Sequence, residues 1–128
     1  MFKVVTDAAP KAVGPYSQGI SIGKLTFVSG QTPLDPSTGT LVEGGIEAQA
    51  EQACKNVKAV LDAAGSSLDK VVKTTCFLLD MGDFQAFNAV YERYFVNRPA
   101  RSCVAVKALP KAAQCEIEAI ALVGEDEV

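Results

Sequence analysis

The residues with the clearest capacity for chemistry are an arginine and a glutamate late in the chain. Arg101 and Cys103 stand two residues apart at the start of a predicted strand, so their side chains point to the same side. A guanidinium matches a carboxylate at two points, which makes Arg101 a candidate carboxylate-binding residue. Glu116, held in a partly dry pocket, could act as the general base that activates a water molecule.

Each of these residues also has a plainer interpretation. Arg101 could form a salt bridge to Glu116 or Glu118, or it could be an exposed charge. Glu116 could be a half-exposed strand residue paired with a lysine or arginine. Cys103 could be a nucleophile if Arg101 lowers its thiol pKa, or simply a packed thiol. The residue types alone leave these alternatives open.

Four further residues stand where a ligand could reach them. Asn88 interrupts the apolar stripe of a predicted helix, so its amide either ties a loop to that helix or faces a ligand. Tyr16 could be a lid or a pocket wall, or it could cover the edge of the core. Ser29 and Gly30 follow a predicted strand, where a glycine would let a ligand approach the backbone closely.

The sequence contains no histidine. This excludes Ser-His-Asp and Cys-His catalysis, histidine-ligated metals and an imidazole base. The cysteines form no C-x-x-C pair, so neither a zinc knuckle nor a thioredoxin-type motif is present, and no metal site is expected. We expect the four cysteines to be small apolar core residues: Cys54, Cys76, Cys103 and Cys115.

Length and charge restrict the class of protein. Its 128 residues fit one domain spanning 1–128. Its net charge of -3 repels phosphate backbones on average, so nucleic acid is not the expected partner. No apolar run is long enough for a signal peptide or a membrane span, and we expect a cytoplasmic protein without a membrane partner. The acidic residues at about 124–128 are typical of a solvated tail.

Periodicity predicts the order hairpin, helix, strand, helix, strand, strand. Two-residue spacing predicts a hairpin, three-four spacing predicts two helices, and a run rich in turn formers predicts a surface loop. The second helix could be capped by Asp80 or Asp83 and carries a stripe from Phe84 to Phe95. The expected hairpin strands are 20–22 and 25–28, the loop is 33–39, the first helix is 46–64, and the later strands are 71–79, 102–107 and 115–123.

This order indicates an α+β domain with both helices on one face of the sheet, since two helices cannot cover both faces. The last predicted strand places a wholly apolar set on one side. Its other side begins with Glu116 and Glu118 and becomes apolar at Ile120 and Leu122. An oligomer interface with a polar pocket at one end would explain this second side, so we expect association through the open sheet face.

Taken together, these segments resemble the RidA/YjgF family, and the resemblance covers nearly the whole chain. It rests on the order and spacing of six motifs. They are Gly14-Pro15-Tyr16-Ser17-Gln18, Ser29-Gly30-Gln31, Asn56-Val57-Lys58, Val72-Lys73-Thr74-Thr75, Pro99-Ala100-Arg101-Ser102 and Glu116-Ile117-Glu118-Ala119-Ile120-Ala121.

The resemblance implies a chorismate-mutase-like α+β fold with a mixed sheet, assembled as a homotrimer with pockets between subunits. It implies hydrolysis of reactive 2-imino acids or enamines, such as 2-iminobutanoate and 2-iminopropanoate, to 2-oxo acids and ammonia, without metal or cofactor. The family's functional positions fall on Tyr16, Ser29, Gly30, Asn88, Arg101, Cys103 and Glu116.

In that scheme the Arg101 guanidinium binds the substrate carboxylate, and the backbone amide of Gly30 also donates a hydrogen bond to it. The backbone carbonyl of Cys103 accepts a hydrogen bond from the imine nitrogen, and Glu116 deprotonates the attacking water. Two features depart from many relatives: a short connection before Pro99, and Arg98, a second positive charge beside the pocket. Both bear on the size and charge of the substrate.

Two other functions are compatible with the resemblance. Some relatives are described as endoribonucleases or translation inhibitors, although an acidic chain without histidine is poorly suited to RNA cleavage. A regulatory module that binds a small carboxylate without turning it over is the other alternative.

Overall fold

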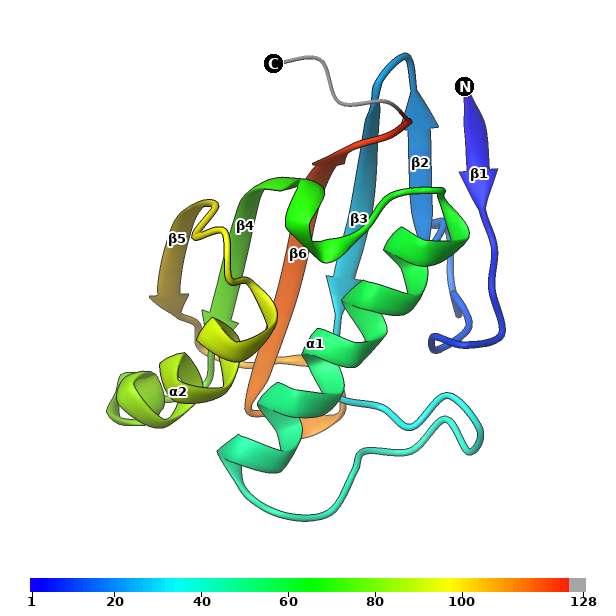
Figure 1. Ribbon diagram of the computed structural model, residues 1–128. Helices are drawn as coiled ribbons and strands as arrows, with labels where there is room; N and C mark the ends of the chain where they lie inside the picture. Colours follow the sequence, from blue (N-terminus) through cyan, green and yellow to red (C-terminus); the bar gives the residue numbers. More distant parts are fainter. Residues whose placement is uncertain (125–128) are drawn as a thin grey trace.

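The computed structural model describes residues 1–124, and their strands form one sheet in the order β1-β2-β3-β6-β4-β5 (Figure 1). The sheet is mixed, because β4 and β5 pair in parallel while β4 and β6 pair antiparallel. Its strands are β1 (Phe2–Val4), β2 (Gly19–Ile22), β3 (Leu25–Gln31), β4 (Val71–Leu78), β5 (Ala100–Ala105) and β6 (Cys115–Leu122).

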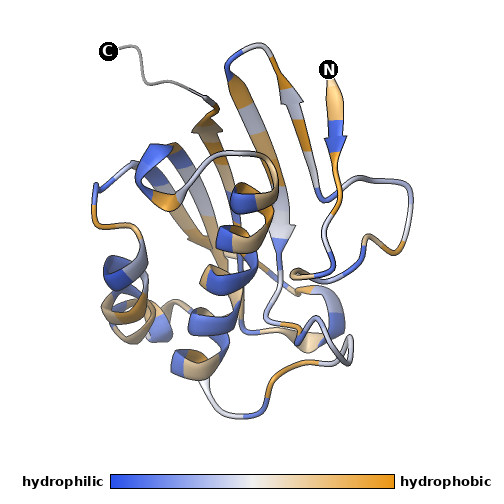
Figure 2. Ribbon diagram, turned by 45° about the vertical axis from the view of Figure 1, so that its right-hand side comes forward, coloured by the Kyte–Doolittle hydropathy of each residue, from blue (hydrophilic) through white to orange (hydrophobic). Residues whose placement is uncertain are grey.

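The α-helices of the described chain, α1 (Ile46–Ala63) and α2 (Phe84–Tyr94), cover the same face of this sheet (Figure 1). Hydrophilic and hydrophobic bands alternate along α1 in Figure 2, as its three-four spacing predicts. The apolar band is buried and includes Val57, Val60 and Leu61, while α2 contributes Phe87 and Val90. Gly65 has a φ of +79°, which suits glycine at the end of a helix.

The opposite face of the sheet, here called the open face, has no helix over it. The strand β6 shows the expected alternation, with Ile117 and Ala119 buried under the helices and Glu118 exposed on the open face. Phe27 of β3 pairs with Ile120 of β6 and is 41% exposed, so apolar side chains continue across strands on this face. The predicted half-polar, half-apolar surface is therefore confirmed.

Several predicted boundaries need correction. The strand after Pro99 begins at Ala100 and ends at Ala105, because parallel pairing with β4 already starts at Lys73 and Ala100. The strand β3 runs on to Gln31, with an irregular register between Val28 and Gln31. The strand β1 was not predicted, since three residues with one buried side chain give no readable alternation.

The predicted helix cap is divided between two aspartates. The Asp80 side chain accepts a hydrogen bond from the Gly82 amide and caps a 3-10 turn at Met81–Asp83. Asp83 then stands at the N-cap of α2 without a side-chain bond. Two further 3-10 turns lie at Leu68–Lys70 and Pro110–Ala112. The predicted acidic tail, apart from Gly124, lies outside the described residues.

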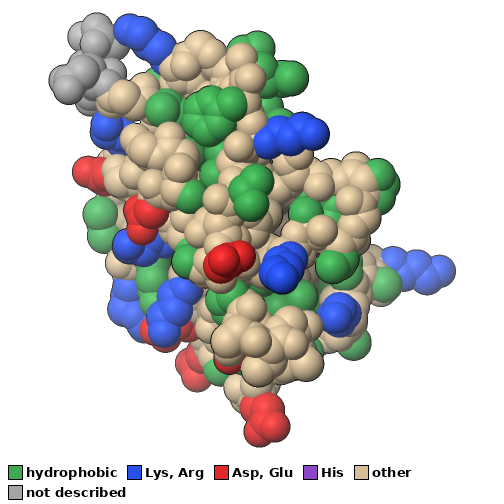
Figure 3. All heavy atoms as spheres, turned by 90° about the vertical axis from the view of Figure 1, so that its right-hand side faces the viewer, with side chains coloured by type: hydrophobic (Ala, Val, Ile, Leu, Met, Phe, Trp, Pro, Cys, Tyr) green, Lys and Arg blue, Asp and Glu red, His purple; other side chains and the backbone are tan. Residues whose placement is uncertain are grey.

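Acidic and basic side chains are interspersed on the side of the molecule shown in Figure 3, and the basic ones form no continuous patch on that side. Within residues 1–124, no helix is long and apolar enough to cross a membrane.

Candidate active site

A cavity of about 440 Å³ surrounds Glu116 at the polar end of the open face. We call it the glutamate cavity. Its wall combines the loop before β2, the end of β3, the following loop and the turn before β6. It is lined by Val13, Tyr16, Ser29, Gly30, Thr32, Leu34, Pro110, Lys111, Glu116 and Glu118. Residues predicted from two separate motifs, Tyr16 from one and Ser29 and Gly30 from the other, therefore lie around Glu116.

Gly30 makes room for the Glu116 carboxylate. A Cβ placed on Gly30 would overlap the Glu116 side chain at Oε2, so no other residue fits here without moving the carboxylate. Ser29 is fixed beside it, because its hydroxyl donates a hydrogen bond of 2.5 Å to the Ser17 carbonyl. Tyr16 is half-exposed and forms part of the wall, as one of its two interpretations predicts.

Glu116 is half-buried, and this burial raises the pKa of its carboxyl above the ordinary value. The like charge of Glu118, two residues along the same strand face, raises that pKa further. A carboxylate with a raised pKa is a stronger base than an exposed one, which suits proton removal from water.

A second hollow, a groove of about 330 Å³, lies between α2 and the start of β5. We call it the arginine groove. It is lined by Asn88, Tyr91, Glu92, Phe95, Arg98, Pro99 and Arg101. Arg101 is half-buried, and its Nη1 donates a hydrogen bond of 2.8 Å to the Asn88 side-chain oxygen. Asn88 thus satisfies its amide oxygen by orienting the arginine.

Two aromatic rings of α2 pack against the Arg101 guanidinium. The Arg101 Cζ lies 4.8 Å from the ring centroid of Tyr91 and 5.6 Å from that of Phe84, within the range of cation-π attraction. Tyr91 is itself held, because its hydroxyl lies 2.6 Å from the hydroxyl of buried Thr74 on β4. A guanidinium has five N–H donors, so the bond to Asn88 leaves donors for a carboxylate ligand.

Cys103 lies on β5 on the same side as Arg101, as predicted, and packs against the core. Burial raises the pKa of the Cys103 thiol, and the charge of Arg101 only partly offsets that rise. The thiol is therefore protonated at neutral pH, which favours the packed-thiol interpretation over a nucleophile. Cys54, Cys76 and Cys115 are free and buried, as expected.

Arg101 and Glu116 lie on opposite faces of the sheet. On β4, Arg101 is in register with Thr74, which is buried under the helices. Glu116 is in register with Phe77, three residues further along β4. Positions three apart in a strand point to opposite sides. Among residues 1–124, Arg101 forms no salt bridge with Glu116 or Glu118, so that interpretation is wrong.

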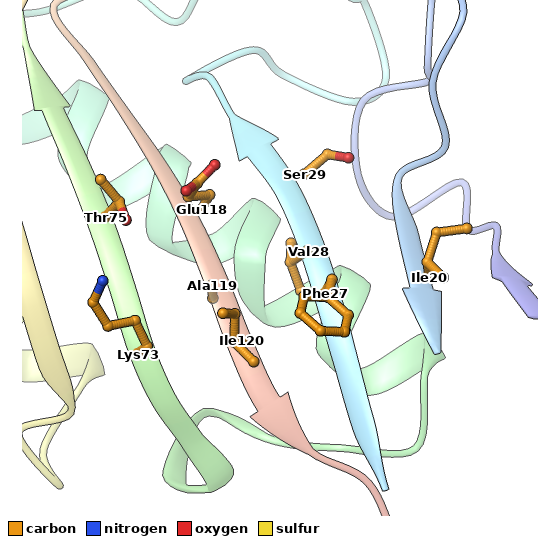
Figure 4. A pocket seen from close by; sticks show the side chains of 9 residues that line it. All are labelled: Ile20, Phe27, Val28, Ser29, Lys73, Thr75, Glu118, Ala119 and Ile120. Atoms are coloured by element: carbon orange, nitrogen blue, oxygen red, sulfur yellow. The ribbon is translucent and has the colours of Figure 1, made fainter. Parts of the chain in front are cut away.

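The open face also holds a shallow depression of about 350 Å³ that adjoins the glutamate cavity through Ser29 and Glu118. Figure 4 shows its side chains standing on β2, β3, β6 and β4, with the helices behind the sheet. Phe27 and Ile120 form its apolar part, and Lys73 and Thr75 lie on the β4 side.

Sequence reasoning missed several residues of both hollows. Tyr91 and Phe84 were assigned to the apolar stripe of the second helix, since aromatic residues at that spacing are typical of core. Pro110 and Lys111 fall between the predicted strands 102–107 and 115–123, where the sequence predicts only a connection. The unusual signal at Lys111, a φ of +57° in a residue other than glycine, exists only in the structure. Within residues 1–124, no group of three or more metal-ligating side chains comes together.

This arrangement, an α+β domain with a mixed sheet and helices on one face, is shared with proteins of known structure. The sequence profile described as Endoribonuclease L-PSP matches residues 6–123, so the chain belongs to that family, which includes the RidA/YjgF proteins. The resemblance stated from the motifs is thereby confirmed.

Individual relatives are similar over almost their whole length. The 2-iminobutanoate/2-iminopropanoate deaminase of Salmonella typhimurium is 48% identical over 123 residues, which cover 93% of this chain and 95% of that protein. A Thermotoga maritima crystal structure superposes with a TM-score of 0.95 at 53% identity, covering 98% and 99% of the two chains. The structure of Escherichia coli TdcF with bound serine superposes with a TM-score of 0.92 at 41% identity. The superposition covers 97% of this chain and 100% of TdcF.

Proposed function

We propose that this protein hydrolyses reactive 2-imino acids, such as 2-iminobutanoate and 2-iminopropanoate, to 2-oxo acids and ammonia. The observation that carries the proposal is the Arg101 guanidinium, which Asn88 and two aromatic rings hold in place with donors left for a carboxylate. The family includes deaminases of this name, and the solved relative with bound serine accommodates a molecule of similar size.

In the proposed reaction, Arg101 binds the substrate carboxylate with its fork and the Gly30 amide assists. The Cys103 backbone carbonyl accepts a hydrogen bond from the imine nitrogen. Glu116 removes a proton from water as the water oxygen bonds to the imine carbon, and the C=N π electrons move to nitrogen, which takes up a proton. Collapse of the resulting aminoalcohol expels ammonia and leaves the 2-oxo acid, with the water oxygen now in its carbonyl group.

We further propose that the site is completed between copies of the chain, assembled as a homotrimer. One chain holds Arg101 and Glu116 on opposite faces of its sheet, so a single copy cannot bring them to one substrate. The exposed apolar residues of the open face, such as Phe27 and Ile22, provide a surface that association would cover. Such contact would also shield the glutamate cavity from water.

The decisive experiment generates 2-iminobutanoate in situ with a threonine dehydratase and follows 2-oxobutanoate formation. The protein should accelerate it. Glu116→Gln should reduce the accelerated rate by about a hundredfold or more, as expected for loss of a general base. Arg101→Lys, which keeps the charge and loses the fork, should lower kcat/KM about ten- to hundredfold.

Glu43→Gln, at an exposed glutamate before α1, is the matched control and should keep the wild-type rate. Equal product formation with and without protein would overturn the enzyme proposal. If a small carboxylate still bound in an Arg101-dependent manner, the chain would be a binding module. RNA cleavage that persists in Arg101→Ala and Glu116→Ala would come from a contaminant or an unrelated site.

A further inference from the structure

The arginine groove contains a second arginine that the proposed reaction does not use. Arg98 lines the groove together with Arg101, and Glu92 is the one carboxylate in its lining. Arg98 is exposed, and within residues 1–124 its guanidinium forms no hydrogen bond or ion pair. The groove thus combines two guanidinium groups with one carboxylate, a local positive excess in a chain whose net charge is -3.

The backbone of Arg98 is strained. Its φ is +55°, in the left-handed region that arginine rarely adopts, and it directly precedes Pro99, which restricts the preceding residue further. The Arg98 amide donates a hydrogen bond of 3.1 Å to the Phe95 carbonyl, which turns the chain from α2 towards β5. This turn requires the left-handed conformation, which glycine or asparagine would adopt at lower cost.

The turn therefore does not require an arginine side chain at position 98. A strained residue whose side chain has no partner inside the protein but lines a ligand groove is a candidate for a functional role. Arg98 and Arg101 line the same groove. The substrate carboxylate would bind to the Arg101 guanidinium, which leaves the Arg98 guanidinium available for a second anionic group.

We propose that Arg98 is a specificity-determining residue that binds a second anionic group of the substrate. The preferred substrates are then 2-imino acids with a carboxylate at the end of the side chain, as formed by oxidation of glutamate or aspartate. This inference rests on the proposed deaminase function, and the reaction at the imine carbon is unchanged. Arg98 selects the substrate and takes no part in proton transfer.

The test compares two imines of nearly equal shape, produced in situ by an amino-acid oxidase from glutamate and from glutamine. The side chain of the first imine ends in a carboxylate and that of the second in an amide. The ratio of their kcat/KM values therefore measures recognition of the side-chain charge. We expect the wild type to favour the glutamate-derived imine. Arg98→Asn, which is neutral and suited to the left-handed backbone, should lower that ratio about fivefold to tenfold.

Two variants control this measurement. Arg98→Lys should retain part of the preference. Arg93→Gln changes the net charge equally at an exposed arginine of α2 that does not line the groove, so it should leave the ratio unchanged. The thermal midpoint of Arg98→Asn should equal or exceed that of the wild type, because backbone strain is relieved.

Binding of unreactive analogues separates the two proposals. Calorimetry should show that the wild type binds glutarate more tightly than its monoamide, glutaramate, and that Arg98→Asn loses this difference. If that holds while neither imine is turned over, the deaminase function is wrong and the role of Arg98 stands. The role of Arg98 would be overturned if Arg98→Asn kept both wild-type ratios. These are the kcat/KM ratio of the two imines and the affinity ratio of glutarate to glutaramate.

Discussion

The environment of Glu116 opposes its ionisation, and this has a consequence for stability. The carboxylate is half-buried beside Glu118, and only the missing side chain of Gly30 gives it space. Because folding raises its pKa, the folded state binds this proton more tightly than the unfolded state does. The associated stabilisation is fully present below the ordinary pKa of 4.5 and is lost as the pH rises through the raised value.

Glu116→Gln should therefore be more stable than the wild type at neutral pH, although it loses activity. The difference in urea midpoint should shrink as the pH falls from the raised pKa towards about 4.5, because the wild-type carboxyl then becomes protonated and resembles the amide. Urea unfolding at a series of pH values measures this directly. Glu43→Gln, at an exposed site, serves as the control, and a wild type more stable than Glu116→Gln at neutral pH would contradict the assignment.

At this scale, residue chemistry was more predictable than residue proximity. The guanidinium fork of Arg101 and the base strength of Glu116 follow from their types, and the shared side of Arg101 and Cys103 follows from strand parity. The salt-bridge interpretation failed because parity within one strand says nothing about the register between strands. That register, Thr74 with Arg101 and Phe77 with Glu116, is set by pairings across distant segments.

Among the elements, α1 does more than cover the sheet. Asn56 is buried on its inner side, and its amide donates hydrogen bonds of 2.9 Å to the carbonyls of Thr32 and Leu34. Both of these residues line the glutamate cavity. The helix thereby holds the loop that forms one wall of the candidate site.

Asn56→Ala should leave two carbonyls without donors and destabilise the protein by about 2 kcal/mol or more. The loosened wall should also lower kcat/KM about threefold to tenfold, since catalysis depends on exact positioning. Urea unfolding and the imine assay measure the two effects. Lys55→Ala, at the neighbouring exposed residue, is the control and should change stability by less than about 0.5 kcal/mol. Unchanged activity in a destabilised Asn56→Ala would show that the loop position is unimportant.

The long elements were predictable from periodicity alone, and α1 differs from its expected range by one residue. The short edge strand β1 and the early start of β5 were not, since tertiary pairing rather than local pattern defines them. The fold class followed from the order of elements. The placement of β6 between β3 and β4 did not, because strand order depends on which segments meet in space.

At the scale of the whole molecule, the proposal that the site is shared between copies makes a quantitative prediction. Arg101→Ala and Glu116→Ala should each be inactive alone. If the two are unfolded together and refolded as mixed oligomers, a site formed by an intact arginine and an intact glutamate from different chains arises in about a quarter of positions. Activity should therefore recover to about a quarter of the wild-type value.

Mixing the two folded variants without unfolding is the control and should restore nothing while subunits do not exchange. A complete lack of recovery after joint refolding, with mixed oligomers verified by mass, would place the site within one chain. A wild-type mass in solution equal to a single chain would refute the assembly itself.

The position of β6 has a consequence for how the molecule forms. Its ladders to β3 and β4 are the ones that connect the β1-β2-β3 part of the sheet to the β4-β5 part, yet it is the last element of the described chain. Until β6 pairs with both β3 and β4, no strand pairing joins the two parts of the sheet. The sheet should therefore close late, after β1 to β5 have all left the ribosome, and the strand that closes it is also the one that carries Glu116.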